Sequence, residues 1–366
     1  MTKRPQQRPK EWRISSMTWE NNIRKVVPYT PGEQTKDPEM VKINTNECPY
    51  PPAPAVQEAM GKMDYDRLRL YPEPACDSLV NSIAAYHGVN KNQVFVGVGS
   101  DDVISMAFLT FFHGDKPILF PDITYSFYDV WADVYGIKYE KVALDDDFRI
   151  VASDYYKENG GIIFPNPNAP TGVCESLSLI EDILEHNKDS VVIVDEAYVD
   201  FGGESALSLI DKYENLLVTR TFSKSRSMAG LRIGYAIGQE KLIKYLSDVK
   251  FSVNSYTMNM PSLILGPLSI ADDEYFKETV GKVIKTREWM KLELSALGFT
   301  FPDSKSNFVF ATHPKYNAGD IMAYLREHKV LVRHFSAKRI DNYLRISVGT
   351  DEQAKRLIDV LKDFIK

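Results

Sequence analysis

One stretch of the chain decides the fold: residues 216–232 read LLVTRTFSKSRSMAGLR. Its first three residues are apolar and predict a strand that is buried on both faces of a sheet. Two hydroxyl residues, Lys224, several small residues and Arg232 follow that strand. A lysine just beyond a buried strand can lie in a cleft, where desolvation favours the neutral amine, and a neutral amine can form a Schiff base with an aldehyde. The alternative is a solvated lysine in a serine-rich loop.

Similar apolar runs occur on both sides of this stretch and alternate with helical patterns such as residues 178–187. Several of these runs are almost entirely Val, Ile, Leu and Phe, which is typical of strands in the interior of a parallel sheet. The sequence therefore predicts an α/β fold with a large, mostly parallel sheet. We expect its strands at residues 93–99, 117–121, 139–144, 160–165, 190–198, 216–223 and 232–238.

The pattern changes after residue 270 and predicts a smaller α+β domain. We expect helices at 273–297, 318–328 and 351–365, and strands at 307–313, 330–335 and 343–349. The first 70 residues are rich in Pro, Asn and Tyr, so we expect them to be mostly irregular and to wrap the body or a partner subunit. The predicted organisation is thus an N-terminal segment and dimer arm (1–70), a large domain (71–272) and a small C-terminal domain (273–366).

Composition excludes several classes of protein. A length of 366 residues fits about two domains. The formal net charge of -6 argues against a protein built to coat nucleic acid or an anionic membrane. Three separated cysteines and no CxxC argue against a disulfide framework or a zinc ribbon and favour a reducing, cytoplasmic location. Six scattered histidines give no metal-binding pattern, and no apolar run approaches the length of a membrane span.

Three further polar elements also follow strands. Asp195 ends the apolar run VVIVD, where ligands bind in α/β sheets, and Tyr198 lies three residues further on. Residues 166–172, NPNAPTG, form a rigid turn in which either X-Pro bond can be cis. Residues 97–102, GVGSDD, place small residues at a helix N-terminus, which suits a phosphate. Each element alone has an ordinary structural interpretation, namely a helix cap or ion pair, a simple turn, and a capped helix.

Together and in this order, the four elements resemble the fold-type I pyridoxal-phosphate enzymes, and most closely the class I and II aminotransferases. Within that family the likeness is greatest to the histidinol-phosphate aminotransferases, and it covers residues 25–366. The resemblance implies a seven-stranded, mostly parallel sheet in a cofactor-binding large domain, a smaller α+β domain, and a homodimer. It also implies pyridoxal 5'-phosphate as the cofactor.

The resemblance assigns a role to each matching residue. Lys224 resembles the lysine that holds the cofactor as a Schiff base, and Asp195 resembles the partner of the pyridine nitrogen. Tyr198 and Asn168 resemble the donors to the pyridine hydroxyl, although Ala169 stands where many relatives have Asn. Tyr125 resembles the aromatic residue on the cofactor ring, and Tyr71 the residue that reaches the cofactor phosphate of the other subunit. The expected phosphate cup is Ser100, Asp101, Thr221, Ser223 and Arg232.

The same resemblance extends to the substrate. Tyr29, Asn46, Arg333 and Arg345 match substrate-binding positions, and the two arginines match those that hold the acidic end. The implied reaction is transamination of histidinol phosphate with 2-oxoglutarate. An aromatic amino-acid aminotransferase and a threonine-phosphate decarboxylase remain as alternatives, because they would share the cofactor residues. A nicotinamide dehydrogenase, suggested by GVGSDD, lacks the acidic ribose partner that its motif needs.

Overall fold

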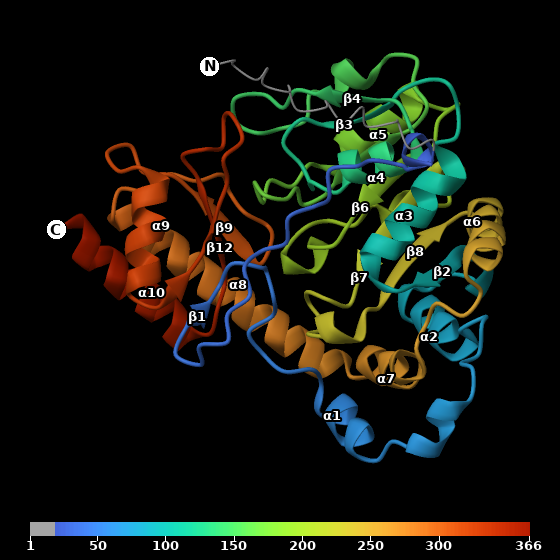
Figure 1. The fold of residues 1–366 in the computed structure, drawn as a ribbon, viewed down its shortest axis with the longest axis horizontal. Helices are drawn as coiled ribbons and strands as arrows, with labels where there is room; N and C mark the ends of the chain where they lie inside the picture. Colours follow the sequence, from blue (N-terminus) through green and yellow to red (C-terminus); the bar gives the residue numbers. More distant parts are fainter. Residues whose placement is uncertain (1–18) are drawn as a thin grey trace, which may run out of the picture.

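The structure is a computed structural model and describes residues 19–366. In that range the strands form three sheets, and the largest has seven strands in the order β2-β8-β7-β6-β5-β3-β4 (Figure 1). Only β8 runs antiparallel to its neighbours in this sheet, so the predicted mostly parallel α/β fold is confirmed. All seven strands lie within the predicted ranges: Val94–Gly97 (β2), Ile118–Pro121 (β3), Tyr139–Val142 (β4), Ile162–Pro165 (β5), Val192–Asp195 (β6), Leu216–Thr221 (β7) and Gly234–Gly238 (β8).

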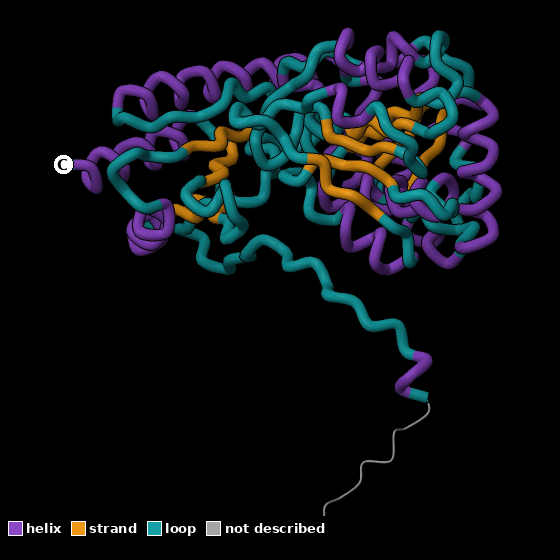
Figure 2. The backbone as a smooth tube through the Cα atoms, turned by 90° about the horizontal axis from the view of Figure 1, so that it is seen from above, coloured by secondary structure: helices purple, strands orange, loops and turns teal. Residues whose placement is uncertain are grey.

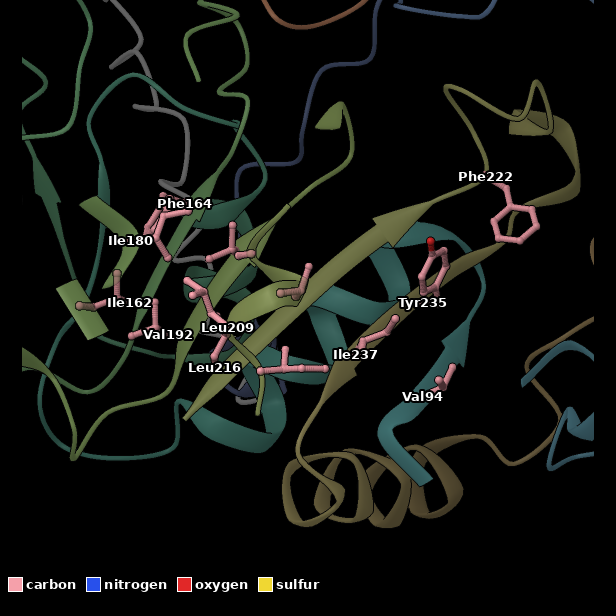
Figure 3. Packing of buried hydrophobic residues seen from close by; sticks show 14 of the residues in the cluster. Val94, Ile162, Phe164, Ile180, Val192, Leu209, Leu216, Phe222, Tyr235 and Ile237 are labelled. Atoms are coloured by element: carbon pink, nitrogen blue, oxygen red, sulfur yellow. The ribbon is translucent and has the colours of Figure 1, made fainter. Parts of the chain in front are cut away.

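The large sheet is buried on both faces because its strands carry apolar residues at nearly every position. Along β6, Val192 and Val194 enter one core cluster while Ile193 enters another on the opposite face. The close-up of the first cluster shows side chains from successive strands, among them Ile162 of β5, Val192 of β6 and Leu216 of β7 (Figure 3). This period-2 alternation with apolar residues on both sides explains why the strands read as continuous apolar runs.

Helices supply both covering layers. One layer consists of Gly99–Phe111 (α3), Tyr128–Tyr135 (α4) and Glu240–Val253 (α6), which share a core cluster. The other consists of Asp77–His87 (α2), Leu177–His186 (α5) and Met260–Ala271 (α7). Short 3-10 turns complete this part of the chain: Lys91–Gln93 (η3), Ala152–Tyr155 (η4), Val199–Phe201 (η5), Ala206–Leu209 (η6) and Ala229–Leu231 (η7).

Two small sheets lie with the C-terminal helices. Strands Arg333–His334 (β11), Leu344–Ser347 (β12) and Phe308–Ala311 (β9) form an antiparallel sheet, and Val41–Lys42 (β1) pairs in parallel with Val330–Leu331 (β10). Helices Asp273–Ala296 (α8), Ala318–Glu327 (α9) and Asp351–Ile365 (α10) agree with the predicted ranges. The single strand predicted at 330–335 is wrong, because its two halves pair with different partners, β1 and β12.

The N-terminal segment is less irregular than expected. It contains Glu20–Asn22 (η1), Pro54–Gly61 (α1) and Tyr65–Arg69 (η2), and α1 begins with a proline, which is favourable at the first helical position. Between η1 and β1 the chain is extended and runs along the outside of the molecule (Figure 2). The predicted arm begins at residue 1, and its first 18 residues lie outside the described range. No helix within residues 19–366 has the length and apolar character to cross a membrane.

Candidate active site

The ends of several large-sheet strands meet at two adjoining cavities. The inner cavity has a volume of about 200 Å³ and the outer cavity about 150 Å³. Lys224, Tyr125 and Tyr198 line both cavities, so Lys224 lies where they join. Of the other predicted residues, the inner cavity contains Ser100, Asp101, Asp195, Ser223 and Arg232, and the outer cavity contains Tyr29, Asn46, Arg333 and Arg345.

Lys224 follows β7 and is half-buried, as the position of a lysine beyond a buried strand predicts. Its Nζ donates to the backbone oxygen of Thr45 at 3.5 Å and lies 5.6 Å from the centre of the Tyr198 ring. No carboxylate in residues 19–366 forms a salt bridge with it. An amine without an ionic partner is available for covalent chemistry.

Asp195 ends β6 and is only 4% exposed. Its Oδ2 accepts a hydrogen bond from the Tyr128 hydroxyl at 3.0 Å, and its Oδ1 accepts one from the Ala197 backbone at 3.2 Å. Burial raises the pKa of Asp195 to about 6, and the two hydrogen bonds oppose that rise. A buried carboxylate without a cationic neighbour is suited to hold a ligand that carries a positive charge or an N–H group.

Another part of the inner cavity is built from the start of α3 and the loop after β7. Arg232 donates from Nη2 to Asp101 Oδ2 at 3.1 Å, and the Tyr125 hydroxyl donates to the other oxygen of Asp101 at 2.8 Å. A Cβ at Gly99 would lie 2.4 Å from the Arg232 guanidinium, and one at Gly234 would lie 2.3 Å from the Gly99 backbone. These two positions therefore exclude side chains and keep backbone and guanidinium donors close together.

The hydroxyl groups of Thr221 and Ser223, also predicted for the phosphate cup, are hydrogen-bonded to each other. Thr221 Oγ1 lies 3.0 Å from Ser223 Oγ and accepts a hydrogen bond from the Ser223 backbone at 3.1 Å. Ser223 lines the inner cavity, whereas Thr221 is buried and reaches it through Ser223. Ser100 lies in the first turn of α3, where the helix end favours an anion.

Asn46 and Asn168 occupy different surroundings. Asn46 donates to the Tyr198 hydroxyl at 3.0 Å and is held by Ser347, whose hydroxyl lies 2.9 Å from Asn46 Oδ1. Asn168 donates to Thr171 within its turn and to the backbone oxygen of Ile123 in the segment after β3, while its buried Oδ1 has no partner among the described residues. Ala169, and not Asn168, lines the two cavities, so the role of Asn168 as a cofactor donor stays a prediction. Both X-Pro bonds of this turn are cis.

Two arginines lie side by side in the wall of the outer cavity. Arg333 in β11 and Arg345 in β12 are paired residues of neighbouring strands. Arg345 donates from Nη2 to the Asn44 backbone at 3.1 Å, but its buried Nε has no partner within residues 19–366. Burial, together with the charge of Arg333, lowers the pKa of Arg345. Tyr29 lines the same cavity and stacks on Phe127, with ring centres 4.1 Å apart.

Tyr71 lies apart from the other predicted residues. It is 81% exposed, lines neither cavity, and packs at 4.7 Å between ring centres against Tyr256, which is also exposed. This position agrees with a residue that acts on a second subunit, and that role stays a prediction.

Sequence reasoning missed the residues that support the site. Tyr128 lies three residues after Tyr125 and bonds Asp195, while Ser347 lies two residues after Arg345 and bonds Asn46. The alternation along a strand could have indicated Ser347, because it shares a face with Arg345. No signal in the sequence pairs Tyr128 with Asp195. Within residues 19–366, no group of three or more His, Cys, Asp or Glu is placed to hold a metal ion.

Comparison with known proteins agrees with this geometry. The family model for aminotransferases of class I and II matches residues 38–361. The chain is 49% identical over 350 residues to histidinol-phosphate aminotransferase of Lactococcus lactis subsp. cremoris (strain MG1363), covering 96% of this chain and 98% of that protein. It is 52% identical over 346 residues to histidinol-phosphate aminotransferase 1 of Pseudomonas aeruginosa, covering 94% and 99%.

A solved structure shares the fold. It is histidinol-phosphate aminotransferase from Sinorhizobium meliloti in complex with pyridoxal-5'-phosphate, with a TM-score of 0.78 and 22% identity over 88% of this chain and 90% of that one. The family resemblance seen in the sequence is confirmed by the family model and by these relatives. The chain belongs to the class I and II aminotransferases.

Proposed function

We propose that this protein transfers the amino group of histidinol phosphate to 2-oxoglutarate, giving imidazole acetol phosphate and glutamate in histidine biosynthesis. The relatives that match nearly its whole length carry the name histidinol-phosphate aminotransferase. Its cofactor is pyridoxal 5'-phosphate, the cofactor of the family.

The residues of the inner cavity fit that cofactor. Asp195 is a buried carboxylate without a cationic neighbour, which suits a protonated pyridine nitrogen. In the same cavity, Arg232 can donate to a phosphate through its guanidinium, and Ser100 and Ser223 through their hydroxyl groups. Gly99 and Gly234 carry no side chain beside the start of α3, where backbone N–H groups favour an anion. Lys224 lines the same cavity, and its amine has no salt-bridge partner among residues 19–366. The cavity thus brings together a buried carboxylate, an amine and an arginine with hydroxyl groups, the three kinds of group that the cofactor requires.

When bound, pyridoxal phosphate supplies an electron sink for the charge that develops as a proton leaves the α carbon of the amino substrate. The protein's own groups do the rest. Asp195 would hold the ring nitrogen of the bound cofactor in its protonated form, and Tyr128 keeps Asp195 oriented. Lys224 Nζ, where the cavities join, is the general base that takes the α proton and the general acid that returns a proton.

The presence of both Arg333 and Arg345 in the outer cavity is the main support for the proposed substrate. The two residues are directly paired on neighbouring strands, so their side chains lie on the same face of the sheet, and no acidic side chain within residues 19–366 forms a salt bridge with either. The buried Nε of Arg345 has no hydrogen-bond partner among the described residues, which lowers the stability of the protein unless a ligand accepts a hydrogen bond from it. A guanidinium fork binds a phosphate or a carboxylate bidentately, so one site can accept the phosphate of the donor and the distal carboxylate of 2-oxoglutarate in turn.

A donor panel tests the proposal. Histidinol phosphate, histidinol, phenylalanine and threonine phosphate are each offered to the holoenzyme, and conversion of the cofactor to its amino form is followed by absorbance. We expect histidinol phosphate to react at least about a hundredfold faster than histidinol, because about 3 kcal/mol of charged hydrogen bonding is lost without the phosphate. Equal reaction with phenylalanine would favour the aromatic aminotransferase, and release of carbon dioxide from threonine phosphate would favour the decarboxylase.

We further propose a cytoplasmic homodimer that binds no nucleic acid and no membrane, with the organisation 1–70, 71–272 and 273–366. Tyr71 and Tyr256 support a second copy, because the two rings pack on each other and both remain exposed within the described chain. Free Cys48, Cys76 and Cys174 support a reducing compartment. The confinement of the large-sheet strands to residues 94–238 supports the middle domain.

A further inference from the structure

The loop of residues 335–343 joins the two strands that carry the substrate arginines. It leaves β11 just after Arg333 and enters β12 just before Arg345. In its middle, Arg339 has a φ of 73°, in the left-handed region that residues with a side chain seldom adopt. Such a conformation persists where surrounding contacts hold it, and it often marks a functional constraint.

Arg339 is fixed entirely by acceptors from the large-sheet side of the molecule. Its Nη1 donates to Asp122 Oδ2 at 3.1 Å, and its Nη2 donates to the backbone oxygens of Leu144 at 3.0 Å and Asp145 at 2.6 Å. The guanidinium also lies 5.7 Å from the centre of the Phe148 ring. Asp122 follows β3, and the other three residues follow β4, so Arg339 links the small sheet to the ends of two large-sheet strands.

Asp122 is itself held in place. Its Oδ1 accepts from the Leu144 backbone at 2.9 Å, so the carboxylate bridges the two strand ends as well as Arg339. It lies three residues before Tyr125, which lines both cavities of the site. The contact therefore ties the loop that carries the arginines to the loop that carries Tyr125.

An apolar contact accompanies this polar one. Ile340 is 5% exposed and belongs to the core cluster of the large sheet, and Tyr343 packs edge-on against Phe148 with ring centres 5.5 Å apart. Within the described chain, every hydrogen bond from loop 335–343 to the large-sheet side comes from Arg339. A cavity of about 550 Å³ lies beside this contact and is lined by Asp122, Tyr125, Arg333 and Phe335.

We infer that Arg339 is a positioning residue: by clamping loop 335–343 onto Asp122, it sets where Arg333 and Arg345 lie relative to Tyr125 and Lys224. The inference rests on the proposed function, because it takes the two arginines as the site for the anionic end of the substrate. Arg339 lines neither cavity of the site, so it acts through the arginines and does not touch the substrate.

This role predicts a selective kinetic effect. Without the clamp the arginines lose their fixed position, so substrates that use them bind less well, whereas Lys224 and Asp195 are unchanged. The KM for histidinol phosphate should rise with little change in kcat, because binding of the remote anion is lost in ground state and transition state alike. Histidinol has no phosphate, so its KM should not change.

The test compares the holoenzyme with variants Arg339→Met, Arg339→Lys and Asp122→Asn. Arg149→Met is the matched control, because Arg149 lies next to Phe148 but pairs with Glu175 at 3.1 Å and not with the loop. We expect Arg339→Met to raise the KM for histidinol phosphate about tenfold and that for histidinol less than about twofold. Arg339→Lys and Asp122→Asn should give a rise of about threefold, since each keeps part of the contact.

Calorimetric binding of inorganic phosphate to each holoenzyme separates this inference from the proposed function. Arg339→Met should weaken phosphate binding about tenfold and Arg149→Met not at all, whichever amine proves to be the donor. If the wild type does not prefer histidinol phosphate but phosphate binding still depends on Arg339, the proposed function fails and the inference stands. The inference is overturned if Arg339→Met matches the control, or if it raises the KM for both donors equally.

Discussion

Replacing Arg345 by methionine should make the substrate-free enzyme more stable while nearly abolishing its activity. In the structure the Arg345 guanidinium lies between the rings of Phe308 and Phe335, at 5.5 and 5.7 Å, beside the like charge of Arg333. Its buried Nε is unsatisfied, and such a group costs about 1–3 kcal/mol. Methionine has a similar length and no polar atoms. After about 1 kcal/mol is subtracted for the lost Nη2 bond to the Asn44 backbone, Arg345→Met should raise the free energy of unfolding by up to about 2 kcal/mol.

The same change removes the fork that we propose for the substrate. Each hydrogen bond to a charged group contributes about 1.5–3 kcal/mol, so two bonds amount to about 3–6 kcal/mol. At about 1.4 kcal/mol per factor of ten, kcat/KM for histidinol phosphate should fall about 10²- to 10⁴-fold. Arg345→Lys keeps the charge but loses the fork, and it should impair both half-reactions. Arg333→Lys should weaken mainly the phosphate-bearing donor.

A buried arginine that does have a partner provides the control. Arg220 Nη2 lies 2.8 Å from Glu196 Oε2, and its Nη1 lies 3.3 Å from Asp200 Oδ1. Glu196 is buried, so Arg220→Met leaves a buried charge unpaired and should destabilise the protein by about 3–5 kcal/mol. Thermal unfolding of the holoenzymes in a phosphate-free buffer compares the two variants. Loss of stability in Arg345→Met similar to that in Arg220→Met would refute the view that Arg345 awaits an anion.

Three other predictions concern the cofactor. Borohydride reduction should attach the cofactor to Lys224, as peptide mapping can show, and Lys224→Ala should lose transamination; label on the buried Lys250 instead would contradict the assignment. Because burial raises the pKa of Asp195 to about 6, the affinity for the cofactor should fall as the pH decreases through about 6. Tyr128→Phe removes a hydrogen bond to the carboxylate, so it should move the midpoint of a spectroscopic titration upward by about one pH unit. An unmoved midpoint would show that Asp195 is not the titrating group. Tyr71→Phe should weaken cofactor retention by about 1.5–3 kcal/mol, measured by dialysis, and an active monomer in sedimentation would contradict the role across subunits.

The large sheet could be predicted because its strands are buried on both faces. Strands such as β6 therefore appear as continuous apolar runs that need no knowledge of their neighbours. The order of strands in the sheet was not predicted, since pairs such as β2 with β8 join residues far apart in the sequence. The break between β10 and β11 was missed for the same reason: it depends on which partner each half of 330–335 meets.

The candidate site divides in a similar way. Lys224 and Asp195 were found because Asp195 ends one apolar strand and Lys224 lies three residues beyond another, so the position of the strand fixes the position of the side chain. Tyr128 was missed because its contact with Asp195 arises only when α4 packs on the sheet. Arg339 was missed because its three acceptors lie about 200 residues earlier and two of them are backbone oxygens, which leave no mark in the sequence.

Charged residues that stabilise the fold are paired with each other, whereas four of those in the candidate site are not. Arg220 and Glu196 pair fully within the protein, and Arg339 pairs with Asp122, so these groups hold the structure together without a ligand. Four charged residues have no ionic partner among residues 19–366: Asp195, Lys224, Arg333 and Arg345. Asp195 lines the inner cavity, the two arginines line the outer cavity, and Lys224 lines both. A protein interior keeps charges unpaired only at a cost. The kinds of group that lack an ionic partner, namely a carboxylate, an amine and two guanidinium groups, therefore support the proposed site for a pyridinium cofactor and a substrate with an anionic end.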